Sequence, residues 1–298
     1  MRELLLGHEP EVEDLPPGEH EHGDGDGTGQ PVTVGGSPLD DVLASIETMA
    51  AQRPIAAQIV ALTEGSDAGA RDVARLLAAD PALSGRVLKL ANSAYYGMRG
   101  RVGSLQFAIA VVGFSVVRSM ATVALTDTRD ESQLPEDYWT VSTHLALAAS
   151  ALAPRLGSRP QDAVCVGLLA QLGVALLHHH DRAGYDAVRE AGPTPAARRV
   201  AETQRYGTDA LGLTALAMRS WAFPGALVDP VSQVDDLASA PGGLLRGALE
   251  ITGRLTRDGH QVERIERLTG GRVSEVDLRP MLTQVRTDAA ELRRTLLG

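Results

Sequence analysis

The amino-acid sequence predicts an all-α protein, and three observations support this fold class. Apolar residues recur at helical spacing, as Ile55, Ile59 and Leu62 do. Residues that cap helices precede such runs, and glycine or proline follows them. No stretch of useful length alternates between apolar and polar residues, as a half-buried strand would. The sequence therefore indicates about eleven helices or more, joined by short connectors.

The first predicted helices begin at recognisable capping residues. Ser37-Pro38-Leu39-Asp40 combines a capping serine, a proline at the first helical position and an acid in the first turn. Asp80 and Pro81 repeat this pattern before a second apolar run. Ser104 is expected to cap a helix that runs to Val112, where Gly113 interrupts it before another helix follows.

The second half of the chain continues in the same way. Helices are predicted at 138–154, 161–180, 182–191, 194–206, 208–220, 240–258 and 275–296. Proline and glycine cluster near Asp235–Gly243, which marks a soft boundary. We therefore divide the chain into a tail at 1–36, a helical domain at 37–235 and a helical extension at 236–298. The extension is expected to pack on the domain.

Charge is concentrated in the tail. The 298 residues carry a net charge of −10, of which residues 1–36 contribute −8 through nine acids against one arginine. This tail has few apolar residues, so it cannot offset the entropy cost of ordering and is expected to be disordered. The hydrophobic content of the whole chain, 44%, suffices for a core, which must be aliphatic because aromatic residues make up only 3%.

Composition also argues against several classes of protein. The nearly neutral remainder shows no basic footprint, which disfavours a nucleic-acid binder. Continuous apolar runs fall short of the roughly 18 residues of a membrane helix, and the first residues do not resemble a signal peptide. A single cysteine, Cys165, excludes an internal disulfide and a cysteine-rich metal site. We expect a cytoplasmic protein that binds neither nucleic acid nor membrane.

The most informative motifs lie between residues 80 and 113. The helix that begins at Asp80-Pro-Ala-Leu ends at Asn92-Ser93, and Tyr95-Tyr-Gly97 follows it. Asn92 and Ser93 can form local hydrogen bonds at the helix end, and Gly97 permits a tight turn. An apolar helix then ends in Ala108-Ile-Ala-Val-Val-Gly113. The simplest interpretation is a structural helix–loop–helix, and the alternative is that Asn92 and Ser93 contact a ligand.

Further motifs follow at Trp139-Thr-Val-Ser142, Gly167-Leu-Leu-Ala-Gln-Leu-Gly173, Glu202 before Tyr206-Gly207, and Trp221-Ala-Phe-Pro224. Together these segments resemble the HDOD domain, the HD-related output domain of bacterial signalling proteins. The resemblance runs from about Leu39 to Asp235 and implies an α-helical domain in two lobes. The motif positions, which we interpret as structural, are Asp80, Pro81, Asn92, Ser93, Gly97, Gly113, Trp139, Ser142, Gly167, Gly173, Trp221 and Pro224.

The resemblance also implies where related HD hydrolases hold metal ions. Those enzymes use an adjacent His-Asp pair, further histidines and a final aspartate, and the metals activate water. The matching positions here are Ala170-Gln171, Val141, Asp209 and Gln233-Val234-Asp235. A methyl group and an amide do not replace an imidazole and a carboxylate as ligands. The resemblance therefore implies no metal site, and we expect no cofactor.

Other candidate sites have simpler explanations. His178-His-His-Asp181 contains a literal His-Asp pair, and His178 and Asp181 are spaced to share a helix face. We interpret this run as a solvated helix end, with adventitious metal binding as the alternative. Ala108–Arg118 suggests a helix-turn-helix, but its second helix is mostly apolar and offers only Arg118 as a base. His144 and Cys165 are expected in or beside the core.

The sequence therefore predicts a bacterial, non-catalytic HDOD module that acts in signalling or regulation. It is expected to act through contacts with a partner protein or by sensing a small ligand, and the resemblance identifies neither. The alternative is a metal-dependent phosphohydrolase, acting on a nucleotide or cyclic dinucleotide, with a rebuilt site. Metal-linked activity would distinguish the alternative, because the module predicts none.

Overall fold

The computed structural model describes residues 37–44, 54–63, 69–98, 100–126, 134–221 and 223–297. The acidic tail at 1–36, expected to be disordered, lies outside these residues. Within them every regular element is a helix and there is no strand, so the all-α prediction is confirmed.

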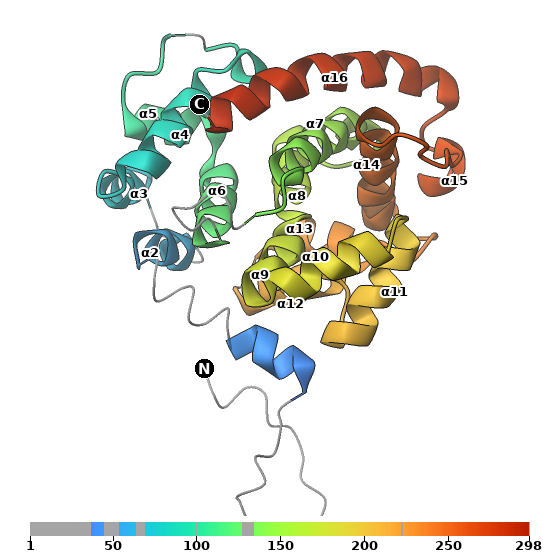
Figure 1. The fold of residues 1–298 in the computed structure, drawn as a ribbon. Coiled ribbons are helices and arrows are strands. Elements are labelled where there is room, and N and C mark those ends of the chain that lie inside the picture. The colour runs from blue at the N-terminus through green and yellow to red at the C-terminus, as the bar shows by residue number, and fades with distance from the viewer. Residues whose placement is uncertain are drawn as a thin grey trace, which may run out of the picture. The chain divides into compact units, whose positions relative to one another are not determined.

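The first group of helices is drawn from blue to green in Figure 1. Residues 38–44 are helical, and the helices that follow are α2 (Pro54–Leu62), α3 (Ala70–Leu77), α4 (Pro81–Ala91), the 3-10 helix η1 (Ala94–Tyr96), α5 (Leu105–Val112) and α6 (Phe114–Thr126). The predicted caps form: the Asp80 carboxylate accepts from the Leu83 amide at 3.0 Å, and the Ser104 hydroxyl accepts from the Phe107 amide at 3.2 Å. Gly113, at φ 88°, separates α5 from α6, which are bent by 105°.

The second group is built around α7 (Tyr138–Leu156), which packs against α8, α14 and α16 (Figure 1). The other helices are α8 (Pro160–Leu169), α9 (Leu172–His180), α10 (Arg182–Ala191), α11 (Pro195–Tyr206), α12 (Ala210–Ser220), α13 (Gly225–Ser232), α14 (Ala240–Thr256), α15 (Ile265–Leu268) and α16 (Glu275–Leu297). The helix α6 contacts α8 and α9 and so joins the first group to the second.

The last helix, α16, spans the two groups. It packs on α7 and α14 and also reaches α4 and η1, which lie near its C-terminal end (Figure 1). Residues 36–298 thus form one compact unit. The domain boundary that the sequence suggests near residue 235 stays a prediction. The helices on either side of it, α13 and α14, pack directly on each other.

Two glycines allow helices to approach without an intervening side chain. A Cβ on Gly167 would lie 2.4 Å from the Ala146 Cα of α7, and one on Gly173 would lie 1.9 Å from the Ala210 carbonyl oxygen of α12. The Gly173 amide also donates a buried hydrogen bond of 2.8 Å to the Thr214 hydroxyl. Both motif glycines are therefore required by backbone packing.

Between these glycines the structure corrects a predicted element. The helix expected at 161–180 is two helices, α8 and α9, separated by a turn at Ala170–Gln171. Nearly all side chains on both sides of the turn are buried, so no polar face reveals a change of helix axis. The helix α13 was also not predicted, because Gly225 and Pro230 are weak helix formers.

The helices α8 and α9, which form a buried hairpin, bear on the expectation that the chain has no membrane helix. Among the described residues, Pro160–His180 is long and apolar enough to cross a membrane, although no uninterrupted apolar run reaches that length. In the most apolar 18-residue stretch of this segment, 72% is buried inside the protein. The pair α5 and α6 meets the criterion only if it is treated as a single bent span. Burial of this degree is typical of a core helix.

Replacing Gly173 tests the close approach of α9 to α12. We expect Gly173→Ala to lower the free energy of unfolding by about 2–4 kcal/mol, because the new methyl group collides with backbone. Gly85→Ala on α4 is the matched control: no atom lies within 4 Å of the added Cβ, so stability should hold or rise by up to about 1 kcal/mol. Urea denaturation of both variants measures the difference. Equal stability of Gly173→Ala and the wild type would contradict this packing.

Candidate functional site

Asn92 closes the loop that follows α4. Its Nδ2 donates to the Leu88 carbonyl at 3.0 Å and to the Val102 carbonyl at 2.8 Å. Its Oδ1 accepts from the Val102 amide at 3.0 Å. Both amide protons are therefore engaged within the fold, which supplies a physical basis for the structural interpretation of Asn92. Gly97, at φ 66°, ends the short helix in between.

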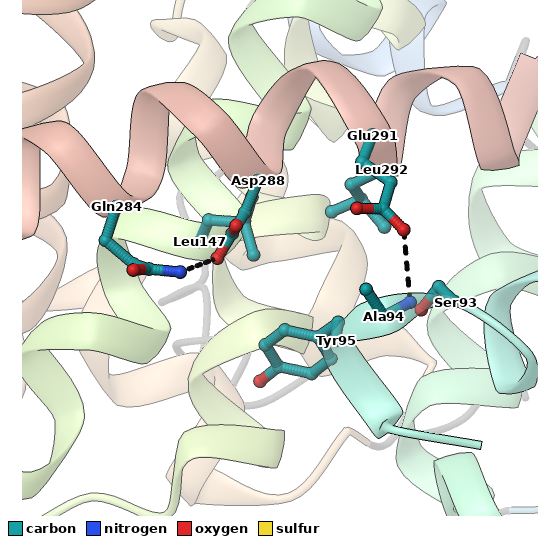
Figure 2. Close-up of a pocket in the computed structure, with 8 residues that line it drawn as sticks. All are labelled: Ser93, Ala94, Tyr95, Leu147, Gln284, Asp288, Glu291 and Leu292. Atoms are coloured by element: carbon teal, nitrogen blue, oxygen red, sulfur yellow. Dashed lines mark hydrogen bonds between the residues drawn. The ribbon is translucent and has the colours of Figure 1, made fainter. Parts of the chain in front are cut away.

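The next residues of the motif lie beneath α16 (Figure 2). The Ala94 amide donates to Glu291 Oε1 at 3.2 Å, and the hydroxyls of Tyr95 and Ser150 are 2.8 Å apart. The Ser93 hydroxyl is buried and has no hydrogen-bond partner among the described residues. A cavity of about 290 Å³ is lined by Ser93, Ala94, Tyr95, Leu147, Gln284, Asp288, Glu291 and Leu292. The C-terminal helix therefore covers this motif.

The remaining motif residues belong to helix packing. Trp139 is half-buried and meets the Tyr138 ring edge-on, with centroids 5.4 Å apart. Ser142 is buried inside α7, and Pro224 is the N-cap residue that precedes α13. These positions are spread over several elements, and the fold does not bring them together into one site.

Arg118 joins α6 to the Trp221-Ala-Phe-Pro224 motif. The Arg118 side chain is buried, and it donates to the Trp221 carbonyl and, at 3.4 Å, to the Thr63 carbonyl. Its guanidinium also lies 4.1 Å from the centroid of the Phe223 ring. The only base of the helix-turn-helix candidate is therefore inside the protein, as expected of a buried helix, and does not face a DNA groove.

The turn at Ala170–Gln171 opens onto the largest cavity described, of about 510 Å³. Its walls come from α9, α11, α12, α14, α15 and the segments between them. Of the positions that match metal ligands in HD hydrolases, Ala170, Gln171, Val234 and Asp235 line it. Val141 is buried in α7 and does not line it. The fold thus assembles most of the ligand positions, but with other residue types.

Arg199 pairs with Asp209 and Asp235, the two aspartates among the positions that match metal ligands in HD hydrolases. Its Nε lies 2.5 Å from Asp209 Oδ2, and its two terminal nitrogens donate to the Asp235 carboxylate at 2.7 Å each. The hydrogen bonds from Arg199 lower the pKa of Asp235. Asp209 also caps α12 by accepting from the Gly212 amide at 2.6 Å. Both carboxylates are therefore held by the protein itself.

Two buried glutamates of the cavity are also fully engaged. Glu202 accepts from the Tyr185 hydroxyl and from the Ala210 amide, each at 2.8 Å. Burial is the main reason why the pKa of Glu202 is raised. Glu250 accepts from Arg254 Nε at 2.6 Å with one oxygen and lies 2.9 Å from His260 Nε2 with the other.

These residues do not fit a metal ion. Among the described residues, no group of three or more His, Cys, Asp or Glu side chains is placed to hold one. The cavity offers an amide at Gln171, the exposed carboxylate of Glu263, and three carboxylates whose oxygens already accept from arginine, tyrosine or backbone donors. A metal would have to displace those donors before it could bind.

The His178–Asp181 run forms no joint site either. His178 is only 3% exposed, and its Nε2 lies 3.3 Å from Asp186. The interpretation as a solvated helix end is therefore wrong for His178, which packs inward beside Tyr185. Asp181 instead caps α10 and pairs with Arg205 at 2.6 Å.

His144 and Cys165 lie where the sequence placed them. Cys165 is buried, which raises the pKa of its thiol to about 12. His144 is half-buried, with its Nδ1 2.7 Å from the Thr140 carbonyl oxygen, and burial lowers its pKa.

Sequence reasoning missed three further residues that line the cavity, namely Arg198, Arg257 and Arg267. They come from α11, from the segment after α14 and from α15. Arginine is common in this chain, so no local pattern singles them out. Only tertiary packing brings them to one cavity.

The family model and the similar solved structures agree on one family. The family model described as "HDOD domain" matches residues 49–237. A crystal structure from Shewanella amazonensis SB2B, described as a "Putative phosphohydrolase", has 25% identity and a TM-score of 0.67, and the match covers 86% of this chain and 98% of that one. An HDOD domain protein of unknown function from Geobacter sulfurreducens has 19% identity, a TM-score of 0.55 and coverage of 85% and 98%. No curated protein matches the chain.

A third structure, described as a "Putative signal transduction protein", comes from Marinobacter aquaeolei VT8. It has 21% identity and a TM-score of 0.56, and the match covers 87% of this chain and 64% of that one. The last two likenesses establish the fold and nothing about activity.

Replacing Asn92 separates its structural role from ligand contact. Asn92→Leu should lower the free energy of unfolding by about 1–3 kcal/mol, because the Val102 peptide loses its partners. Gln106→Leu, on the exposed side of α5, is the control and should change stability by less than about 0.5 kcal/mol. Chemical denaturation measures both variants. Wild-type stability of Asn92→Leu, with signalling lost in the cell, would instead make Asn92 a ligand contact.

Proposed function

The chain belongs to the HDOD domain family, and on this premise we propose that it is a non-catalytic module of signalling or regulation. The observation that carries the proposal is the Ala170–Gln171 turn. By the sequence resemblance, this turn matches the position of the His-Asp pair of the HD hydrolases, and Asp235 and Glu250 beside it are paired within the protein. The cavity therefore has room for a ligand, but the described residues supply no set of metal ligands in it.

Exposed aromatic side chains support action through a partner protein. Only three phenylalanines occur in the chain, and Phe107 and Phe114 are 43% and 39% exposed. They flank the bend at Gly113, and Tyr95 is also partly exposed. Aromatic residues are enriched at the energetic centres of protein interfaces. The proposed partner is a signalling protein that contacts one or more of these exposed aromatic side chains.

The alternative is a metal-dependent phosphohydrolase with a rebuilt site. The name of the Shewanella protein with 25% identity favours it, as does a cavity that contains acidic residues. This function would require the pairs made by Asp235 and Glu250 to open when a metal binds. It would also require a ligand to replace the missing imidazoles.

An activity assay tests the proposal. The purified full chain, supplied with manganese, iron or magnesium, should release no product from nucleoside phosphates or cyclic dinucleotides, because the described residues contain no ligand set that would hold a metal and activate water. Glu202→Gln and Asp235→Asn are assayed in parallel. Turnover that disappears in either variant would contradict the proposal. Turnover that is the same in both variants and does not scale with protein purity comes from a contaminant. That outcome supports the proposed non-catalytic function.

A further inference from the structure

Three guanidinium groups in the large cavity have no partner. Arg198, Arg257 and Arg267 line it, and none forms a side-chain hydrogen bond or ion pair with another residue that the structure describes. The Nε of Arg198 is buried as well as unpartnered. A buried donor without an acceptor is costly, so this one favours an acceptor from outside the chain.

The other charges of the cavity are already balanced. Arg199 is paired with Asp209 and Asp235. Arg246 is buried and donates to backbone carbonyls, among them that of Leu268 at 2.9 Å. The engaged glutamates were described above, and the exposed Glu263 is the one carboxylate of the lining for which the described residues supply no side-chain partner. Unpaired positive charge is therefore in excess.

The surroundings of Arg257 and the start of α11 add to this excess of positive charge. Partial loss of hydration, and then the like charge of Arg198, lower the pKa of Arg257, whereas Asp137 raises it. Asp137 is itself paired with Arg189 at 2.6 Å. The first residues of α11, Pro195 and Ala196, also line the cavity, and a helix N-terminus carries partial positive charge.

Much of the remaining lining is apolar. It contains the side chains of Val174, Leu211, Leu237, Leu249 and Leu268. The volume of about 510 Å³ lies within the range of roughly 300–1,000 Å³ that is typical of small-molecule sites. The lining of the cavity thus combines cationic and apolar side chains.

We propose that this cavity binds a phosphate monoester with an apolar or aromatic body. Arg198, Arg257 and Arg267 hold the phosphate, and the apolar part of the lining covers the body. Guanidinium groups suit this role because they donate paired hydrogen bonds to phosphate oxygens. The inference deepens the proposed function, on which it rests, by giving the module a ligand that it binds without turnover.

Calorimetric titration of the full chain with phenyl phosphate tests the inference. We expect one saturable site, with inorganic phosphate binding about tenfold more weakly because it leaves the apolar part of the lining uncovered. Arg198→Gln and Arg257→Gln should each weaken phenyl phosphate binding about tenfold. Arg286→Gln, exposed on α16 and outside the cavity, is the matched control and should leave binding unchanged.

Two outcomes would overturn the inference: no saturable binding by the wild type, or equal binding by Arg257→Gln and the wild type. Arg257 is exposed, so its variant remains informative even if Arg198→Gln fails to fold. Phosphate release is measured in the same samples. Release would contradict the proposed non-catalytic function while leaving the binding site in place. If phenyl phosphate neither binds nor releases phosphate, the proposed binding site is contradicted and the proposed non-catalytic function is not.

Discussion

The hydrogen bond from the Gly173 amide to the Thr214 hydroxyl forms only because α9 approaches α12 without a Cβ between them. Gly167 allows the same close approach of α8 to α7. These two contacts hold both arms of the α8–α9 hairpin, and so they fix the Ala170–Gln171 turn at its tip. The positions of the cavity walls follow from that turn, since α11, α12 and α14 all meet around it. Backbone packing, more than any polar group, therefore places the site.

Charge pairing then decides what the site can bind. Asp235 and Glu250 are each tied to arginine, and Glu202 is tied to Tyr185 and to backbone. Among the residues that the structure describes, Arg198, Arg257 and Arg267 of the lining have no such partner. A cavity of this kind attracts an anion and offers a metal few free oxygens. A binding role for this cavity is in keeping with the general separation of fold from function.

Most of the fold could be predicted from the sequence, because caps and periodicity are local. Ser104 and Asp80 cap the helices expected of them. The break at Ala170–Gln171 could not be predicted, since residues on every side of it are buried and the pattern shows no polar face. For the same reason the sequence predicts a solvated His178 at a helix end, whereas the structure buries this residue. The arginines of the cavity lie far apart in sequence, so only the tertiary structure reveals that they belong together.

The central claim is that the cavity at the Ala170–Gln171 turn has lost its metal site, and metal content tests it most directly. The full chain is incubated with manganese or iron, passed through a desalting column and submitted to elemental analysis. The account predicts that no stoichiometric metal is retained, because the carboxylates of the cavity are paired within the protein. One or more ions retained per chain, and lost on Asp235→Asn, would contradict it.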